Sequence, residues 1–392
     1  MIYADNAATT QIDPEAYEIM QEYLKAEYGN PSSLYSFARE GKKALSKARK
    51  TIAECINALP EEIYFTSGGS ESDNWAIKGT VLYNNEKSCV ITSQIEHHAI
   101  IRACEQLEHL GFPVAYLAPE KDGTILPETL EKTIYSPRLV SIMLANNEIG
   151  TIEPVRELAD IAHLHGAYFH TDAVQAVGHI PIDVKQLGVD TLSASGHKFG
   201  APKGVGFLYI RNGVKILPLI NGGSQEKGIR GGTENVAAIA AMAAALNNSI
   251  LSMNNTTLFL NKLTEHFLAL LDDSKIKYSI NGSTENRLPG HISISFPEKS
   301  GEALLHQLDL KRIYVSTGSA CDSVRTETSH VLQAIRLPEK LAKGTIRITF
   351  GKNNSISDAE AIATALKRPA KARRLIILFH DSQLIEFNII TQ

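Results

Sequence analysis

One lysine stands in an unusual setting in the stretch "SASGHKFGAPKG", residues 193–204. Lys198 follows a histidine directly, at the expected end of an apolar strand, with glycines and a proline around it. Desolvation and nearby positive charge lower the pKa of an amine and turn it into a nucleophile. Such an amine typically forms an imine with a carbonyl cofactor, and we expect the other groups that such a cofactor needs elsewhere in the chain.

The commonest carbonyl cofactor of this kind is pyridoxal 5'-phosphate, which needs an anion, a phosphate cradle and a group on its ring face. Asp172 in "HTDAVQ" follows an apolar strand, at the sheet edge where ligands of open α/β proteins lie. The stretch "TSGGSES" (66–72) is a strand, a glycine turn and a helix start, which favours anion binding. The pair of histidines in "IEHHA" (95–99) offers a ring. Taken alone, each of these patterns more often has a structural role than a cofactor role: an Asp that caps the end of a strand, a common turn before a helix, and a pair of surface histidines.

The elements that position these groups follow from hydrophobic patterning. Near-continuous apolar runs alternate with amphipathic helical segments such as 70–84 and 155–166. Runs of that kind predict strands buried on both faces of a mostly parallel sheet with helices on either side, an α/β fold. The predicted strands are 62–69, 88–94, 139–150, 167–175, 191–198 and 204–211.

The hydrophobic pattern changes after about residue 212, where the alternation of short apolar strands and helices ends. An alanine-rich buried helix covers 235–250, and a second helix is predicted over 256–273. The strands predicted at 291–297 and 344–351 alternate as half-exposed strands do. We expect a large cofactor-binding domain at 13–257, and a smaller α+β domain that combines residues 1–12 with 258–392.

Composition excludes several classes of protein. The chain has 392 residues, 21% charged, and a net charge of −4, and its only basic run, 367–374, is too short for a nucleic-acid groove. No apolar stretch of the roughly 20 residues that a membrane span needs is expected, and the first residues lack a signal peptide pattern. The four cysteines show no zinc spacing, so we expect no metal site, no structural disulfide and a cytoplasmic location.

A set of motifs in this order carries a family resemblance. They are "YADNAATT", "TSGGSESDN", "EHHAI", "NNEIGTIEP", "HTDAVQAVG", "SGHKFGAPKG", "RGGTENV" and "STGSACDS". On these the chain resembles, over nearly its whole length, the cysteine desulfurases of the NifS/IscS type. These belong to the class V aminotransferase superfamily of fold-type I pyridoxal-phosphate enzymes. The resemblance implies an enzyme that converts L-cysteine to L-alanine and works as a homodimer.

The resemblance also implies a role for each matched residue. Lys198 would hold the cofactor covalently, and Arg347 in "TIRITF" would bind the substrate carboxylate, which suits a planar guanidinium. His97, the first of the two histidines, would stack on the ring and serve in proton transfer. The remaining roles are the pyridine nitrogen for Asp172, the phenolic oxygen for Gln175 and Asn147 (the latter also near the substrate), the phosphate for Gly69, Ser70, Ser195 and His197, and the other subunit's phosphate for Thr233.

Cys321 lies in "STGSACDSVRTETSHVL", a polar stretch typical of a loop. A thiolate attacks sulfur well, and by resemblance Cys321 would take the sulfur of L-cysteine as a persulfide. The stretch from 321 to about 335 resembles the loop of enzymes that hand sulfur to an iron–sulfur scaffold protein. Transfer toward tRNA thiolation, and a transient iron–sulfur ligand role shared with a partner, stay open for Cys321.

The alternative functions depend on fewer of these residues. A selenocysteine lyase or another class V aminotransferase would not depend on Cys321, and a non-enzymatic homologue would be expected to lack Lys198 or Cys321. The sequence departs from the family at Ser70, where threonine is common, and at Lys352, where many relatives have arginine. The tail after about residue 367 does not resemble the family's last helix.

Overall fold

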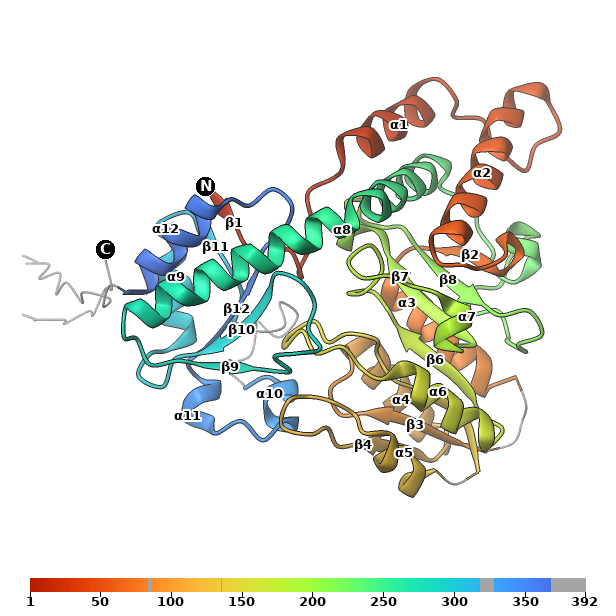
Figure 1. Ribbon diagram of the computed structural model, residues 1–392. Coiled ribbons are helices and arrows are strands. Elements are labelled where there is room, and N and C mark those ends of the chain that lie inside the picture. The colour runs from red at the N-terminus through yellow and green to blue at the C-terminus, as the bar shows by residue number, and fades with distance from the viewer. Residues whose placement is uncertain (84–86, 135, 318–327, 368–392) are drawn as a thin grey trace, which may run out of the picture.

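The computed structural model describes residues 1–83, 87–134, 136–317 and 328–367, and Figure 1 shows a larger and a smaller lobe joined by one long helix. The larger lobe is built on a seven-stranded sheet in the order β2-β8-β7-β6-β5-β3-β4. Its strands are β2 (Ile63–Thr66), β3 (Cys89–Ser93), β4 (Val114–Leu117), β5 (Pro137–Ser141), β6 (Tyr168–Asp172), β7 (Thr191–Ser195) and β8 (Gly206–Ile210).

The strands from β7 to β4 run parallel to their neighbours, and β8 runs antiparallel to both β7 and β2. Successive residues of a strand point to opposite faces, and both faces are buried: Val90 packs into one hydrophobic cluster and Ile91 into another. Each of the six predicted strands is present. The predicted α/β architecture with a mostly parallel sheet is therefore confirmed.

Helices cover both faces of the large sheet (Figure 1). One face packs against α2 (Arg39–Cys55), α6 (Val155–Leu164) and the first half of α8 (Val236–Asp273). The other packs against α4 (His98–His109) and against α3 (Gly69–Asn74), which continues as a π-helical turn over Trp75–Gly79. The shorter or peripheral helices are α1 (Pro14–Lys25), which lies against α8, α5 (Pro127–Thr133) and α7 (Val184–Leu187).

The smaller lobe contains an antiparallel sheet in the order β12-β10-β9 and a two-stranded parallel sheet. Its core is a separate hydrophobic cluster that also takes in residues from the start of the chain, such as Ala4. The elements are β1 (Ile2–Tyr3), β9 (Ser279–Asn281), β10 (His291–Ser295), β11 (Ile313–Tyr314), β12 (Thr345–Thr349), α9 (Gly301–Asp309), α10 (His330–Ala334), α11 (Glu339–Ala342) and α12 (Ile356–Lys367).

The alternating patterns of β10 and β12 were expected to mark half-exposed strands, and this is wrong for both. Every residue of the two strands is buried, because their polar side chains find partners on one another and on neighbouring strands, as the hydroxyls of Ser295 and Thr345 do at 2.7 Å. The side-chain amide of Asn281 donates to the hydroxyl oxygens of Ser293 and Ser295, at 3.2 and 2.9 Å. Buried polar groups that find partners in this way are common, and the pattern alone does not distinguish them from solvent-facing ones.

Helix α8 is continuous over 38 residues, where two separate helices were expected. Its N-terminal half packs into the core of the large lobe, and Leu260, Leu263, Phe267 and Leu271 belong to the core of the small one. A helix of this kind can join two cores rigidly. We propose that the two domains meet within α8, so that the predicted boundary between residues 257 and 258 falls inside a helix and stays a proposal.

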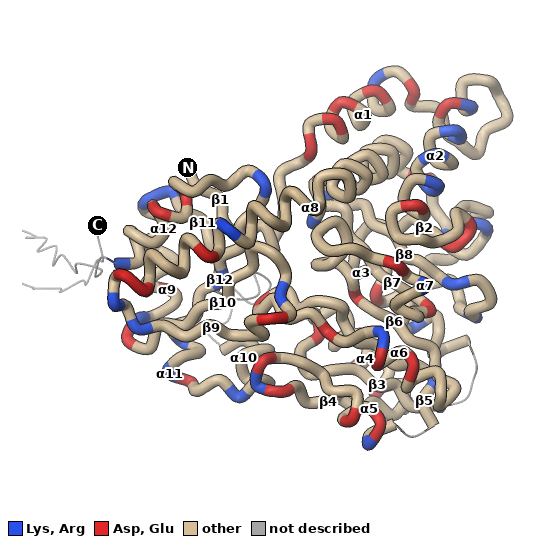
Figure 2. Tube along the Cα trace, in the orientation of Figure 1, with Lys and Arg blue, Asp and Glu red and all other residues tan. Residues whose placement is uncertain are grey.

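The same helix corrects the expectation that no apolar stretch is as long as a membrane span. By length and composition alone α8 is long and apolar enough, with a mean hydropathy of 1.6 in its most apolar window. Figure 2 shows few charged residues along it, and the sequence has none from 236 to 261. Because 56% of that window is buried inside the protein, α8 is packed as a core helix is.

Candidate functional site

A cavity of about 280 Å³ opens at the edge of the large sheet where the parallel strands end. Ten of the predicted site residues line it, and they come from both lobes. These are Gly69, Ser70, His97, Asn147, Asp172, Gln175, Ser195, His197, Lys198 and Arg347. Motifs that are far apart in the sequence, each following a strand or a turn, thus come together around one cavity.

Two predicted residues do not line this cavity. Thr233 lies in a separate hollow of about 130 Å³, together with Ser67 and Arg230. Cys321 lies outside the described residues. Thr233 was expected to act on the other subunit, so its position apart from the cavity neither supports nor opposes that role.

Lys198 ends a short 3-10 turn, Gly196–Lys198, directly after β7. Its Nζ donates hydrogen bonds to the main-chain oxygens of Ala7 at 2.6 Å and Ala8 at 2.9 Å. Gln175 donates to the same Ala7 oxygen at 3.0 Å. The segment before α1 therefore forms a wall of the cavity that sequence reasoning missed, because alanine carbonyls leave no signal in a motif.

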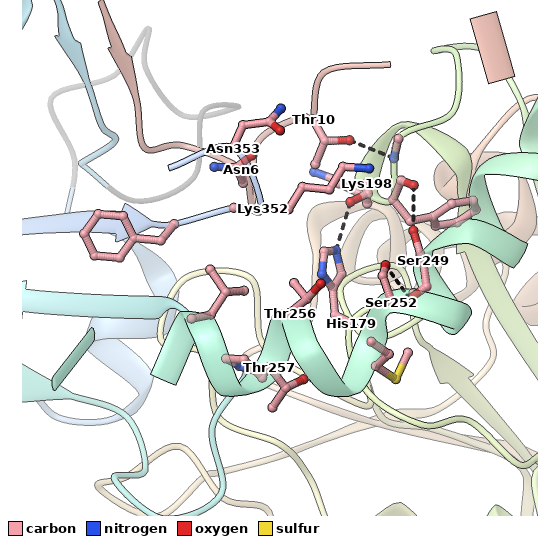
Figure 3. A pocket seen from close by; sticks show the side chains of 18 of the residues that line it. Asn6, Thr10, His179, Lys198, Ser249, Ser252, Thr256, Thr257, Lys352 and Asn353 are labelled. Atoms are coloured by element: carbon pink, nitrogen blue, oxygen red, sulfur yellow. Dashed lines mark hydrogen bonds between the residues drawn. The ribbon is translucent and has the colours of Figure 1, made fainter. Parts of the chain in front are cut away.

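The main chain of Lys198 contacts His179, and both residues line a second, smaller hollow of about 80 Å³ (Figure 3). Nε2 of His179 donates to the main-chain oxygen of Lys198 at 2.9 Å. Burial lowers the pKa of His179, and so does the nearby charge of Lys198. His179 thus stays neutral, and its ring fixes the turn that carries the lysine.

Asp172 is the last residue of β6 and is only 5% exposed. One carboxylate oxygen accepts from the main-chain N–H of Val174 at 2.8 Å. Burial raises the pKa of Asp172 to about 6, although the Val174 hydrogen bond and the charge of Lys198 act in the other direction. A carboxyl group in this state is stabilised as an anion by any cation that enters the cavity.

A second carboxyl group, Asp73 of α3, lines the cavity and was not predicted as a site residue. Burial and the charge of Asp172 raise its pKa well above the ordinary range. Nε2 of His170 lies 3.9 Å from Asp73 and 3.0 Å from the Ser193 hydroxyl. These three buried side chains form a polar network next to the cavity. The burial of position 73 could not be read from its place in a helical first turn.

The glycine turn between β2 and α3 has the shape that an anion cradle needs. Gly68 has φ 148° and ψ −174°, a conformation that essentially only glycine adopts. A Cβ on Gly69 would lie 2.7 Å from a methyl carbon of Val174. Close approach of the backbone is therefore built into this turn, and it leaves main-chain N–H groups and the Ser70 hydroxyl at the cavity.

His197 and His97 are held in defined orientations. Nδ1 of His197 lies 3.1 Å from the hydroxyl of Thr9, and burial, with the charges of Lys198 and Lys203, lowers the pKa of His197 to about 4. His97 precedes α4 as its N-cap, and its Nδ1 accepts from the main-chain N–H of Ala99 at 3.1 Å. The hydrogen of a neutral His97 ring is then on Nε2.

Arg347 lies in the middle of β12 and is only 2% exposed. Its guanidinium donates to Asp5 at 2.6 Å and to the main-chain oxygen of Asn147 at 2.8 Å. Among the described residues its Nε has no hydrogen-bond partner. A buried guanidinium with a spare N–H can take up a further carboxylate oxygen, beside the one that Asp5 supplies.

Comparison with known proteins decides the family. The class-V aminotransferase family model matches residues 2–362. The chain belongs to the cysteine desulfurases of this family. It is 48% identical to "Cysteine desulfurase IscS" of Dictyoglomus turgidum, over 96% of each chain. A solved "NifS-like protein" superposes with a TM-score of 0.88 at 36% identity, covering 93% of this chain and 98% of that one.

A second solved structure, described as "SspA in complex with cysteine", has a TM-score of 0.80 at 34% identity and covers 91% of this chain and all of that one. The family predicted from the motifs is confirmed by these matches. This cysteine desulfurase is therefore an enzyme with the NifS-like, fold-type I architecture.

Proposed function

We propose that the protein is a pyridoxal 5'-phosphate-dependent cysteine desulfurase that converts L-cysteine to L-alanine and retains the sulfur as a persulfide on Cys321. The observation that carries the proposal is the single cavity shared by Lys198, Asp172 and Arg347, in a chain of this family.

The residues present fit the cofactor. A buried carboxyl group with a raised pKa, Asp172, matches a protonated pyridine nitrogen, and the glycine turn at Gly68 matches a phosphate. Of the described residues that line the larger cavity, Lys198 is the one lysine. When bound, pyridoxal phosphate supplies a ring that withdraws electrons and stabilises negative charge at the α-carbon of an attached amino acid.

Each residue of the constellation then has a proposed task. Lys198 would provide the amine that holds the cofactor aldehyde until the substrate amine replaces it. Asp172 would keep the pyridine nitrogen protonated. His97 would contact the ring and move protons through Nε2, and Gln175 and Asn147 would bind the phenolic oxygen. Gly69, Ser70, Ser195 and His197 would hold the phosphate, with His197 as a neutral donor.

Substrate binding and sulfur transfer involve Arg347 and Cys321. Arg347 binds the carboxylate of L-cysteine through N–H groups that Asp5 and Asn147 orient. The Cys321 thiolate attacks the substrate sulfur, the substrate's carbon–sulfur bond breaks, and the carbon takes up a proton. The products are L-alanine and a persulfide, with no external oxidant or reductant needed. The persulfide then passes to an iron–sulfur scaffold protein or another sulfur acceptor.

We also propose a homodimer in which Thr233 reaches the phosphate of the other subunit. The stretch between α1 and α2 exposes several large apolar side chains, which a second copy would cover. These are Tyr28, Leu34, Tyr35 and Phe37, between 43% and 105% exposed. Exposed apolar groups gathered in one stretch are typical of an interface.

Subunit complementation tests the shared site. Homodimers of Thr233→Ala and of Lys198→Ala each have two defective sites, but a mixed dimer has one site with both residues. Refolded mixtures should regain about a quarter of wild-type activity, because half the dimers are mixed and each has one intact site. Activity that stays at the sum of the two variants would contradict a site built from two subunits.

The activity itself is tested by supplying purified protein with pyridoxal phosphate, L-cysteine and an excess of a thiol reductant, which reduces the persulfide and releases its outer sulfur as sulfide, and by measuring alanine and sulfide together. Equal amounts of the two are expected, and Cys321→Ser should abolish sulfide release from cysteine while sparing selenide release from selenocysteine. Undiminished cysteine turnover by Cys321→Ser would contradict the persulfide route.

A further inference from the structure

The glycine turn between β2 and α3 is held on the side of the sheet by two hydroxyl groups. The hydroxyls of Thr66 and Ser72 lie 2.8 Å apart, and that of Ser72 donates to the main-chain oxygen of Gly68 at 3.1 Å. Strand β8 packs directly against the turn, because a Cβ on Gly206 would lie 2.7 Å from the Cα of Gly68. Ser67, which precedes the glycines, is held by a different residue.

Glu71 holds Ser67 through its carboxylate. Oε2 of Glu71 accepts from the main-chain N–H of Ser67 at 2.8 Å, and only 9% of the Glu71 side chain is exposed. The same carboxylate accepts two hydrogen bonds from the guanidinium of Arg230, from Nε at 2.8 Å and from Nη2 at 3.1 Å. A bidentate pair has a well-defined geometry, so the oxygen that meets Ser67 is fixed as well.

Arg230 is itself held in place by the segment to which it belongs. It lies 159 residues further along the chain, and its neighbour Gly231 donates a main-chain hydrogen bond to Ile220 at 3.0 Å. Main chain packs closely on main chain here, because a Cβ on Gly231 would lie 2.7 Å from the main-chain nitrogen of Gly222. The carboxylate of Glu71 therefore ties the start of the glycine turn to a second, firmly packed segment.

The Glu71–Arg230 pair also sets the charge next to the turn. Glu71 follows Ser70 directly, and an anion without a partner so near the proposed phosphate subsite would repel a phosphate. Burial acts to raise the pKa of Glu71, but the hydrogen bonds from Arg230 and Ser67 outweigh it and lower that pKa. Glu71 is therefore an anion at neutral pH, and the guanidinium of Arg230 balances its charge.

We propose that Glu71 is a positioning residue for the cofactor phosphate: by holding the Ser67 N–H and the Arg230 guanidinium together, it fixes the glycine turn in the shape that receives the phosphate. The inference rests on the proposed function, in which this turn binds the phosphate of pyridoxal phosphate. Among the described residues, Glu71 is not one that lines the cavity, so it acts through the turn. Its loss weakens binding of the phosphate group and spares the contacts to the rest of the cofactor.

A comparison of two aldehydes isolates the contribution of the phosphate. Cofactor-free protein is titrated with pyridoxal phosphate and, separately, with pyridoxal, which lacks the phosphate, and the near-visible absorbance band reports the dissociation constant of each. Glu71→Ala should weaken binding of pyridoxal phosphate about tenfold, the effect of one lost hydrogen bond to a charged group, and leave binding of pyridoxal within about twofold. Glu71→Gln keeps an acceptor oxygen for the Ser67 N–H and should recover most of the lost affinity.

The matched control is Glu226→Ala. Glu226 accepts from the main-chain N–H of Phe65 at 2.9 Å and pairs with both terminal nitrogens of Arg49, at 2.8 and 2.6 Å. It thus has the same kinds of contact as Glu71, but it meets strand β2 and not the glycine turn. Both alanine variants should unfold at a lower urea concentration than the wild type, and Glu226→Ala should bind both aldehydes within about twofold of the wild type.

The outcomes separate this inference from the proposed function. An unchanged affinity of Glu71→Ala for pyridoxal phosphate overturns the inference alone, as does an equal loss of affinity for both aldehydes, which would make Glu71 a general support of the cavity. A Glu71→Gln protein that binds no better than Glu71→Ala, or a Glu226→Ala protein with the same selective loss, also overturns it. If the wild type binds no pyridoxal phosphate, the proposed function fails together with the inference.

Discussion

Asp172→Asn is expected to stabilise the cofactor-free protein while it weakens cofactor binding. The structure raises the pKa of Asp172 from 3.8 to about 6, mainly by burial. The folded protein therefore keeps a proton that the unfolded chain releases, and the stability of the wild type falls as the pH rises from about 4 to about 6. At neutral pH a shift of about two units corresponds to roughly 3 kcal/mol at most.

Asparagine removes this penalty, because it is neutral at every pH and its side-chain oxygen can still accept from Val174. The assay is urea unfolding of cofactor-free wild type and variant at several pH values. We expect a gain of up to about 3 kcal/mol above about pH 6 that shrinks toward zero near pH 4, and a weaker affinity for pyridoxal phosphate. A variant that is less stable at neutral pH, or a gain that does not depend on pH, would refute the reasoning.

Three further predictions concern the other walls of the cavity. Arg347→Lys keeps the charge but loses the planar fork, so KM for L-cysteine should rise about tenfold while the cofactor spectrum is retained, as steady-state kinetics would show. Gly68→Ala forces a side chain into a conformation reserved for glycine, and calorimetry should find a loss of about 1–3 kcal/mol with weaker phosphate binding. Lys198→Ala, supplied with pyridoxal phosphate, should lack the near-visible absorbance band that the wild type shows.

The large sheet was predictable because strands that are buried on both faces appear in the sequence as near-continuous apolar runs. Strand β4 escaped prediction: it is short, lies at the edge of the sheet and is only half-buried over Val114–Tyr116. Helix α8 was divided in two because its polar middle, around Asn247 and Asn254, looks like a break. In the structure this part crosses between two cores, where polar side chains are tolerated.

The site was predictable where the chemistry demands a side chain, as at Lys198 and Asp172. It was not predictable where a contact comes from the main chain or from packing. The carbonyls of Ala7 and Ala8 reach Lys198 from the beginning of the chain, about 190 residues away, and the carboxyl group of Asp73 becomes part of the cavity only because α3 is buried. Contacts of this kind depend on tertiary structure, which residue types and spacing do not encode locally.

Mass spectrometry of the peptide that contains Cys321, after the cofactor-loaded enzyme has met L-cysteine, tests the central claim most directly. We expect one added sulfur on Cys321 in the wild type and none in Lys198→Ala, because sulfur release depends on the cofactor that this lysine binds. An unmodified Cys321 in an enzyme that still produces alanine, or sulfur added equally in Lys198→Ala, would contradict the account.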